Sequence, residues 1–384
     1  MESVASLEQA ADRAARSGDS RAAAQLLEQA VKEGPDRPEL WLKLSAMRRA
    51  VGDSQGALQA IDKLLALAPL DFSALLSRAF LLEKLNDPRA GEAFMIAVAQ
   101  APDDDQSLPP PVAAALERAR GKSLAHKNKL AERLKSAVPV GLAPSEQRRV
   151  DRFVTNSARK TRHFHQDPTH FHFPGLPEIE FHDRERFPDL DGLEAATPDI
   201  LAEFNSLLAA EVAEMVPYVR YPERVPLQQW KELNNNRDWT AIHLLQNGKR
   251  IEANARHCPR TMTAIDRLPQ PQVPGASPNA MFSLLAPRTR IPPHTGVANT
   301  RLVCHLPLIV PPGCGFRVGA TTREWKVGEA FVFDDTIEHE AWNDSDELRV
   351  VLIVDLWPPA LSHGEREAVA AIIPAAGVSF TGGM

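Results

Sequence analysis

The sequence predicts an α+β protein of two unlike parts: an N-terminal α-helical repeat array, followed by a double-stranded β-helix of the jelly-roll type. Three observations predict this fold class. Turn signals recur every 34 residues through the first hundred positions. From Pro174 onward the composition shifts toward proline, aromatic residues and short β-branched runs. Two segments of this second part each contain a histidine in a setting typical of a metal-site strand.

Length and charge limit the class of protein. A chain of 384 residues, 43% of them hydrophobic, can form two separate cores. Its formal net charge of -6 and its pI near 6.1 argue against nucleic acid as the main partner, because phosphate binding needs a basic face. We therefore expect no nucleic-acid partner.

The cysteines and the apolar segments indicate a compartment. Cys258, Cys304 and Cys314 are too few and too scattered for a disulfide framework or a Cys-rich zinc site. No stretch of about 18 apolar residues occurs, and the first residues lack the basic and apolar regions of a secretory signal. We expect a cytoplasmic protein with no membrane partner.

The first part of the chain repeats. Glycine or asparagine followed by aspartate recurs at a spacing of 34 residues, in Gly18-Asp19, Gly52-Asp53 and Asn86-Asp87. Each pair separates two Ala/Leu-rich helical patterns, and a proline closes the second pattern. One helical hairpin cannot bury both of its faces, whereas stacked hairpins can. The sequence predicts a tetratricopeptide-repeat array over residues 1–120, with an irregular helical bundle as the alternative.

A polar, proline-rich break at residues 103–111 is followed by a basic, helix-favouring segment from Val112 to about Lys160. We interpret residues 121–165 as a pair of connecting or capping helices. A histidine-rich tract follows, which can indicate metal binding, but its alternating phenylalanines favour an extended edge segment. The histidines are His163, His165, His170 and His172.

Residues 166–384 form the second predicted domain. Short runs rich in β-branched and aromatic residues are separated by turn residues, which predicts strands that close into a barrel or jelly roll. The strand candidates are residues 281–285, 302–310, 316–318, 330–333 and 349–357.

His294 stands in the run IPPHTGVAN (291–299), and His339 in FDDTIEHEAW (333–342). The second and seventh strands of a double-stranded β-helix lie side by side, so the fold could bring the two imidazoles together. Neutral imidazole is a good ligand for Fe(II), and the usual companion is a carboxylate two residues after the first histidine. Here that position is Gly296.

Two interpretations of the missing carboxylate at this position remain open. Either two histidines hold the metal, with water or co-substrate at the other positions, or no metal binds and the barrel is a non-catalytic relative of the cupins. Asp334 and Asp335 could supply a carboxylate ligand, although their place just before His339 favours hydrogen bonds to the local backbone. Arg349, ten residues beyond His339, strengthens the catalytic interpretation.

Residues 174–359 resemble the aspartyl/asparaginyl β-hydroxylase family of 2-oxoglutarate-dependent dioxygenases. Repeats upstream of such a domain also resemble that family. The runs that carry the resemblance are FPGLPEIEF (173–181), FSLLAP (282–287), PHTG (293–296), NTRLVCHLPL (299–308) and FDDTIEHEAWN (333–343).

The resemblance assigns roles. It implies that His294 and His339 are the iron ligands, in a family that uses no ligating carboxylate. Ser283 and Arg349 match positions that hold the distal carboxylate of 2-oxoglutarate, which suits a hydroxyl beside a guanidinium fork. His305 matches the residue that meets the co-substrate near the metal.

One position departs from the family pattern. Members commonly carry an arginine two residues before the position of His305, and here Val303 stands there. Arg301 is then the only guanidinium in the run, and we assign it to co-substrate binding. Either co-substrate binding is rearranged, or the substrate is not the usual peptide acid. Cys304 should face the opposite side of this strand from His305.

The resemblance implies Fe(II), 2-oxoglutarate and O₂ as cofactor and co-substrates, and a hydroxylation of the β-carbon of Asp or Asn in a peptide or protein. The concave side of the array would hold that polypeptide. One alternative is the same chemistry on a free amino acid or other small molecule. Another is a non-catalytic peptide-binding scaffold, against which the joint presence of the five matching residues counts.

Overall fold

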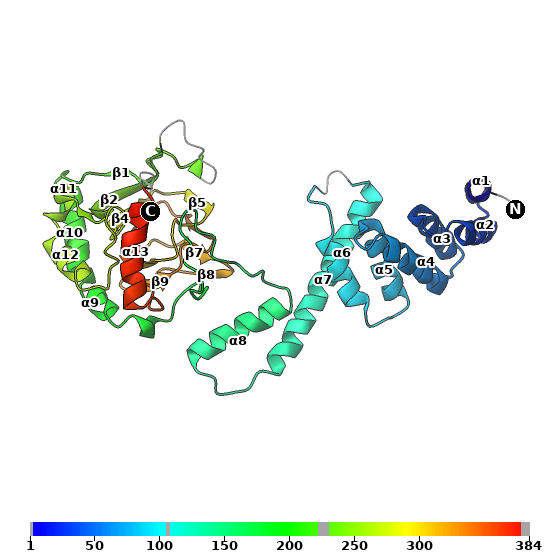
Figure 1. Ribbon diagram of the computed structural model, residues 1–384, viewed down its shortest axis with the longest axis horizontal. Helices are drawn as coiled ribbons and strands as arrows, with labels where there is room; N and C mark the ends of the chain where they lie inside the picture. Colours follow the sequence, from blue (N-terminus) through cyan, green and yellow to red (C-terminus); the bar gives the residue numbers. More distant parts are fainter. Residues whose placement is uncertain (1–2, 105–107, 222–229, 378–384) are drawn as a thin grey trace. The chain divides into compact units, whose positions relative to one another are not determined.

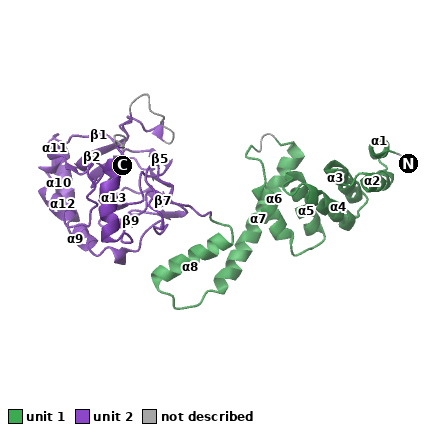
Figure 2. Cartoon of the chain, viewed as in Figure 1, with its two compact units in different colours: residues 1–161 green, residues 162–384 purple. Residues whose placement is uncertain are grey.

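The computed structural model describes residues 3–104, 108–221 and 230–377. The chain divides into two compact units, unit 1 at residues 1–161 and unit 2 at residues 162–384 (Figure 1, Figure 2). The sequence-based limits at residues 120 and 165 stay predictions.

Unit 1 begins with three helical hairpins. Each hairpin turns on a residue in the left-handed region, with φ of 87° at Gly18, 82° at Gly52 and 55° at Asn86. Glycine and asparagine adopt this conformation at low cost, which is why they recur at this spacing. The predicted repeat array is confirmed. Its helices are α1 (Val4–Arg16), α2 (Ser20–Glu33), α3 (Pro38–Ala50), α4 (Ser54–Leu67), α5 (Phe72–Lys84) and α6 (Ala90–Ala99).

The aspartate that follows each of the first two turns caps the next helix. The side chain of Asp19 accepts a hydrogen bond from the Ala22 amide at 2.9 Å, and Asp53 accepts one from the Gly56 amide at 2.8 Å. Leu27 and Ile61 of the second helices are fully buried in two neighbouring clusters. The stacking of hairpins therefore buries the faces that one hairpin would leave exposed.

Two further helices complete unit 1, the long α7 (Pro110–Ser136) and α8 (Pro144–Ser157). Ala119 of α7 joins the core of the third hairpin, whereas most residues of α7 beyond Ser123 are exposed or half-buried. Within the described ranges, no helix of the chain is both long and apolar enough to cross a membrane.

Unit 2 contains two antiparallel sheets. The larger has the order β1-β2-β4-β11-β6-β9 with β3 beside β2, and the smaller has the order β5-β10-β7-β8. The larger sheet is formed by β1 (Val216–Pro217), β2 (Trp239–Gln246), β3 (Lys249–Arg250), β4 (Ala280–Leu285), β6 (Leu302–Ile309), β9 (Phe331–Phe333) and β11 (Arg349–Leu356). The smaller is formed by β5 (Thr289–His294), β7 (Cys314–Val318), β8 (Thr321–Arg323) and β10 (His339–Asn343).

From β4 to β11 the chain passes back and forth between the two sheets. This is the connectivity of a double-stranded β-helix, so the predicted fold class is confirmed. An apolar cluster lies between the sheets, with Met281 and Val351 on one side and Phe316 and Val318 on the other. The candidate site opens within this layer.

Helices cover the outer face of the larger sheet, which the sequence analysis did not predict. α9 (Leu190–Ala195), α10 (Thr197–Ala209) and α12 (Pro259–Ile265) lie along one side of unit 2 (Figure 1). Phe204 of α10 contacts Phe282 of β4, with ring centroids 5.0 Å apart. This cluster explains why β4 and β11 are buried on both faces. The remaining helices are η2 (Arg184–Arg186), α11 (Glu252–Ala255) and α13 (His363–Ala375).

Candidate active site

The two histidines singled out in the sequence lie opposite each other. β5 and β10 pair antiparallel, and their register makes His294 and His339 direct partners. Their ring centroids are 4.0 Å apart, although 45 positions separate them in the sequence. The geometry thus fulfils the expectation that neighbouring strands bring the imidazoles together.

Backbone carbonyls orient both rings. The Nδ1 of His294 lies 2.7 Å from the Pro292 carbonyl oxygen, and the Nδ1 of His339 lies 3.1 Å from that of Ile337. Each carbonyl can accept a hydrogen bond only from a protonated Nδ1, which leaves Nε2 with its lone pair. Burial lowers the pKa of His339 to about 4, and burial together with His339 lowers that of His294. Both rings are therefore neutral at pH 7 and suited to bind a metal.

No carboxylate projects from the position two residues after His294. A Cβ on Gly296 would collide with the carboxylate of Asp335, so the space of a side chain there is already filled. Asp335 accepts a hydrogen bond from Arg301 through Oδ2 at 2.8 Å, while its buried Oδ1 has no partner. Asp334 instead accepts hydrogen bonds from the Thr336 amide and hydroxyl at 2.9 and 2.6 Å, as its position before His339 had suggested.

Arg349 and Ser283 form a second corner of the same cavity. The Nη1 of Arg349 donates to the Ser283 carbonyl and hydroxyl at 3.5 Å, and its Cζ lies 4.9 Å from the centre of the Trp325 ring. Arg349 is only 2% exposed, its Nε has no hydrogen-bond partner, and no described carboxylate pairs with it. Burial lowers its pKa to about 10. Within the part of the chain that the structure describes, it is a buried cation without an anion.

His305 lies between the two corners. Its Nδ1 accepts a hydrogen bond from the Trp325 indole at 3.3 Å, and its ring centroid is 4.8 Å from that of Phe333. Burial and the Arg349 charge lower its pKa, so its ring is also neutral. Cys304 faces the opposite side of β6, in the cluster beneath the covering helices, as the alternation of a strand predicts.

These residues line a cavity of about 50 Å³ between the sheets. A larger cleft of about 460 Å³ lies beside it, and Tyr218 lines both. No sequence motif predicted the aromatic residues of the cavity wall, which are Tyr218, Trp230, Trp239 and Trp325. Trp239 stacks on Tyr218 at 3.8 Å and donates a hydrogen bond to Ser283 at 3.1 Å. The only sequence signal for these residues is the aromatic character of the segments that contain them.

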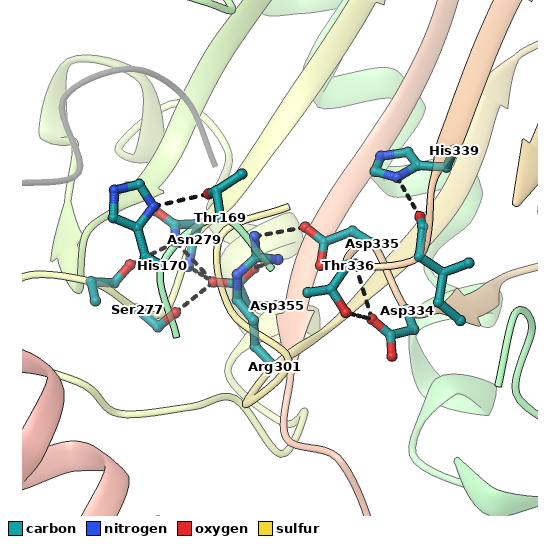
Figure 3. A network of polar contacts seen from close by, with 12 residues as sticks. Thr169, His170, Ser277, Asn279, Arg301, Asp334, Asp335, Thr336, His339 and Asp355 are labelled. Atoms are coloured by element: carbon teal, nitrogen blue, oxygen red, sulfur yellow. Dashed lines mark hydrogen bonds and ion pairs between the residues drawn. The ribbon is translucent and has the colours of Figure 1, made fainter. Parts of the chain in front are cut away.

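Arg301 belongs to a buried polar network with Asp335 and Asp355, which Figure 3 shows together with His339. Its guanidinium pairs with Asp335 at 2.8 Å and with Asp355 at 3.4 Å. Asp355 also accepts hydrogen bonds from the Ser277 hydroxyl and the Asn279 amide at 2.8 and 2.9 Å. Burial opposes the charge of Arg301, but the two carboxylates raise its pKa. The guanidinium assigned to co-substrate binding is thus already paired with protein carboxylates.

The histidine-rich tract contributes to a separate group of possible metal ligands. His163, His165 and Glu178 form an exposed group whose possible ligand atoms lie within 4.8 Å of one another. His165 contacts Glu178 at 3.1 Å. Phe171 forms a bridge to Ala298, so part of the tract is extended along the barrel, as its alternating pattern suggested.

The fold and the paired histidines place unit 2 among the double-stranded β-helix proteins with an imidazole pair between the sheets. The family model of aspartyl/asparaginyl β-hydroxylase matches residues 194–359. The match lies within unit 2 and covers most of it, and hydroxylase is the activity that the relatives of this region share by name.

Three relatives illustrate the match. The human aspartyl/asparaginyl β-hydroxylase is 35% identical over 148 residues, which are 38% of this chain and 19% of the relative. The human aspartate β-hydroxylase domain-containing protein 2 is 33% identical over 53% of this chain and 54% of its own length. The ornithine lipid ester-linked acyl 2-hydroxylase of Rhizobium tropici is 34% identical over 49% and 63%. The chain therefore spans between a fifth and two thirds of these relatives.

Two solved structures illustrate the structural comparison. The type III secretion chaperone SycD of Yersinia enterocolitica covers 32% of this chain and 88% of its own, with 15% identity and a TM-score of 0.27. The Sgt2 TPR domain of Aspergillus fumigatus covers 37% and 93%, with 18% identity and a TM-score of 0.28.

Proposed function

We propose that unit 2 is an Fe(II)- and 2-oxoglutarate-dependent dioxygenase that hydroxylates the β-carbon of an Asp or Asn side chain in a peptide or protein. The family match supports a hydroxylase. The observation that carries the finer proposal is the presence of two features in one cavity: two neutral imidazoles whose Nδ1 atoms bind backbone carbonyls, and a buried guanidinium that no carboxylate of the described residues pairs with.

The residues fit the proposed groups. His294 and His339 would hold Fe(II) through Nε2, and Arg349 with Ser283 would hold the distal carboxylate of 2-oxoglutarate. When bound, Fe(II), 2-oxoglutarate and O₂ would supply the oxidation of an unactivated carbon. Burial of a cation with no partner is costly, and an incoming carboxylate removes that cost. His305 would border the co-substrate, while Trp239 and Trp325 would orient Ser283 and His305 and exclude water.

The proposal also includes the substrate and the role of the repeat array in binding it. The array would hold a polypeptide on its stacked helices, because repeat arrays present extended concave surfaces. Hydroxylation of a free small molecule is the second candidate, which the named activity of the Rhizobium tropici relative favours. A cytoplasmic location stays a prediction.

The first experiment tests the metal and co-substrate site. Metal-free protein is titrated anaerobically with Fe(II) and then with 2-oxoglutarate, and the weak visible charge-transfer band of the chelate is recorded. The band should appear in the wild type and be lost in His294→Ala and His339→Ala. His363→Ala is the matched control, because that side chain is 90% exposed and remote from the cavity lining. A folded wild type without the band, with Fe(II) in excess, contradicts the proposal and favours a repeat-plus-barrel binding protein.

A further inference from the structure

The described residues place few permanent positive charges near the histidine pair. Three arginines line the cavity or the adjoining cleft, namely Arg220, Arg301 and Arg349. Arg220 is exposed at the mouth of the cleft. Arg349 is buried and unpaired, and under the proposed function the co-substrate carboxylate takes its charge. The cation that remains inside is Arg301.

The positive charge of Arg301 is already compensated by protein carboxylates, so it cannot balance the charge of another anion. Its guanidinium lies between Asp335 and Asp355, at 2.8 and 3.4 Å, and all three side chains are at most 7% exposed. One positive charge facing two carboxylates leaves the trio without a positive surplus. A substrate carboxylate near this trio would meet repulsion as well as the cost of its own desolvation.

Two further residues of the cavity wall also disfavour a substrate carboxylate. Val303 lies on the cavity face of β6, two residues before His305, and offers an apolar surface with no donor. Asp335 lines the cavity, and its buried Oδ1 has no hydrogen-bond donor among the described residues. A carboxylate oxygen in this state needs an N–H or O–H group. An amide supplies one, and a second carboxylate does not.

We propose that the substrate group reaching the His294–His339 pair is an uncharged amide, as in an asparagine side chain, and not a carboxylate. This inference rests on the proposed function and narrows its substrate class. An asparagine amide would donate to Asp335 and add no charge to the interior. An aspartate carboxylate would be buried without a counter-cation beside Asp335.

The test measures binding, so it does not depend on turnover. Full-length protein is loaded anaerobically with Fe(II) and 2-oxoglutarate and titrated by calorimetry with two probes, N-acetyl-asparagine amide and N-acetyl-aspartate amide. The wild type should bind the asparagine probe at least about tenfold more tightly. Val303→Arg adds a guanidinium to the wall and should strengthen binding of the aspartate probe by at least about tenfold.

Val327→Arg is the matched control, because it adds the same charge at a side chain that is 54% exposed in the same unit. It should leave the ratio of the two dissociation constants unchanged. Asp335→Asn is the second variant, and it is titrated with the same probes if Val303→Arg does not fold. By removing one of the two carboxylates that pair with Arg301, it should also strengthen binding of the aspartate probe.

The outcomes separate the two proposals. Loss of the charge-transfer band in the loaded wild type would overturn the proposed function before either probe is added. With the band present, equal or tighter binding of the aspartate probe to the wild type overturns the amide inference. If neither probe binds the wild type measurably, the variants decide: a gain of aspartate binding supports the inference, and no gain in either folded variant refutes it.

Discussion

Arg349 is the residue on which the co-substrate assignment depends. It is buried against Trp325, and among the described residues no carboxylate accompanies it. Structural arginines in protein interiors are normally paired, because an isolated buried charge is costly. A site that must receive a dicarboxylate provides the physical reason for keeping this one unpaired.

Replacing Arg349 by Met should therefore have opposite effects on binding and stability. Affinity for 2-oxoglutarate should fall by about 10- to 100-fold, because a charge-assisted hydrogen-bond pair is lost. The free energy of unfolding of the ligand-free protein should stay level or rise by about 1–2 kcal/mol, because a buried unpaired charge is removed. Calorimetric titration and urea unfolding measure the two quantities. Arg290→Met, on an exposed side chain of β5, is the control. A destabilised variant with unchanged co-substrate affinity would show that Arg349 is structural.

His182 is a second single residue with a predicted effect, because it should make the stability of the folded protein depend on pH. Burial lowers its pKa from about 6.5 to about 4, and neither ring nitrogen has a hydrogen-bond partner among the described residues. Below pH 6.5 the unfolded chain binds a proton that the folded chain refuses, so stability falls as the pH drops from 6.5 toward 4. Above pH 6.5 both states are neutral and this effect is absent.

The free energy of unfolding should fall between pH 7 and pH 5 in both proteins. In His182→Asn this fall should be about 2 kcal/mol smaller than in the wild type. Urea unfolding of both proteins at the two pH values measures the difference. His172→Asn, an exposed histidine of the nearby tract, should behave as the wild type does. Parallel stability curves for the wild type and His182→Asn would show that the ring is protonated in the folded protein.

At the scale of elements, the repeat helices depend on short-range signals. The left-handed turn residue and the aspartate after it act within a few positions, and the sequence therefore predicts the phase of the array. The strands behave differently. β4 and β11 are buried on both faces because α9, α10 and α12 cover the sheet, and no local pattern of the strands predicts those helices.

Asp53→Ala removes the N-cap of α4. The Gly56 amide loses its acceptor, and the helical unit should lose about 1 kcal/mol of unfolding free energy. Thermal unfolding followed by far-UV circular dichroism measures the change. Asp36→Ala makes the same chemical change at an exposed turn residue outside any helix and should cost little. An equal loss in both variants would argue against the cap.

At the scale of the whole molecule, each unit has its own hydrophobic clusters, two in unit 1 and three in unit 2. The candidate site draws all its residues from unit 2. Ligands of that site should therefore stabilise one unit and not the other.

Differential scanning calorimetry should show two transitions in the full-length protein. Fe(II) with 2-oxoglutarate at about 100 times the dissociation constant should stabilise the unit 2 transition by about 2.7 kcal/mol and leave the unit 1 transition in place. In His294→Ala the shift should be absent. A single transition that moves as a whole would show that the units unfold together.

The sequence by itself determined the repeat phase and the strand-rich second domain, and it predicted the five site residues that match the family resemblance. These depend on local turn geometry, strand composition and short motifs. The tertiary structure decided which groups are paired and which are free. Arg301 meets Asp355 across 54 positions, and Trp239 reaches Ser283 across 44. Sheet register creates such contacts between segments distant in sequence. No local pattern could therefore have predicted that Arg301 is neutralised while no described carboxylate pairs with Arg349.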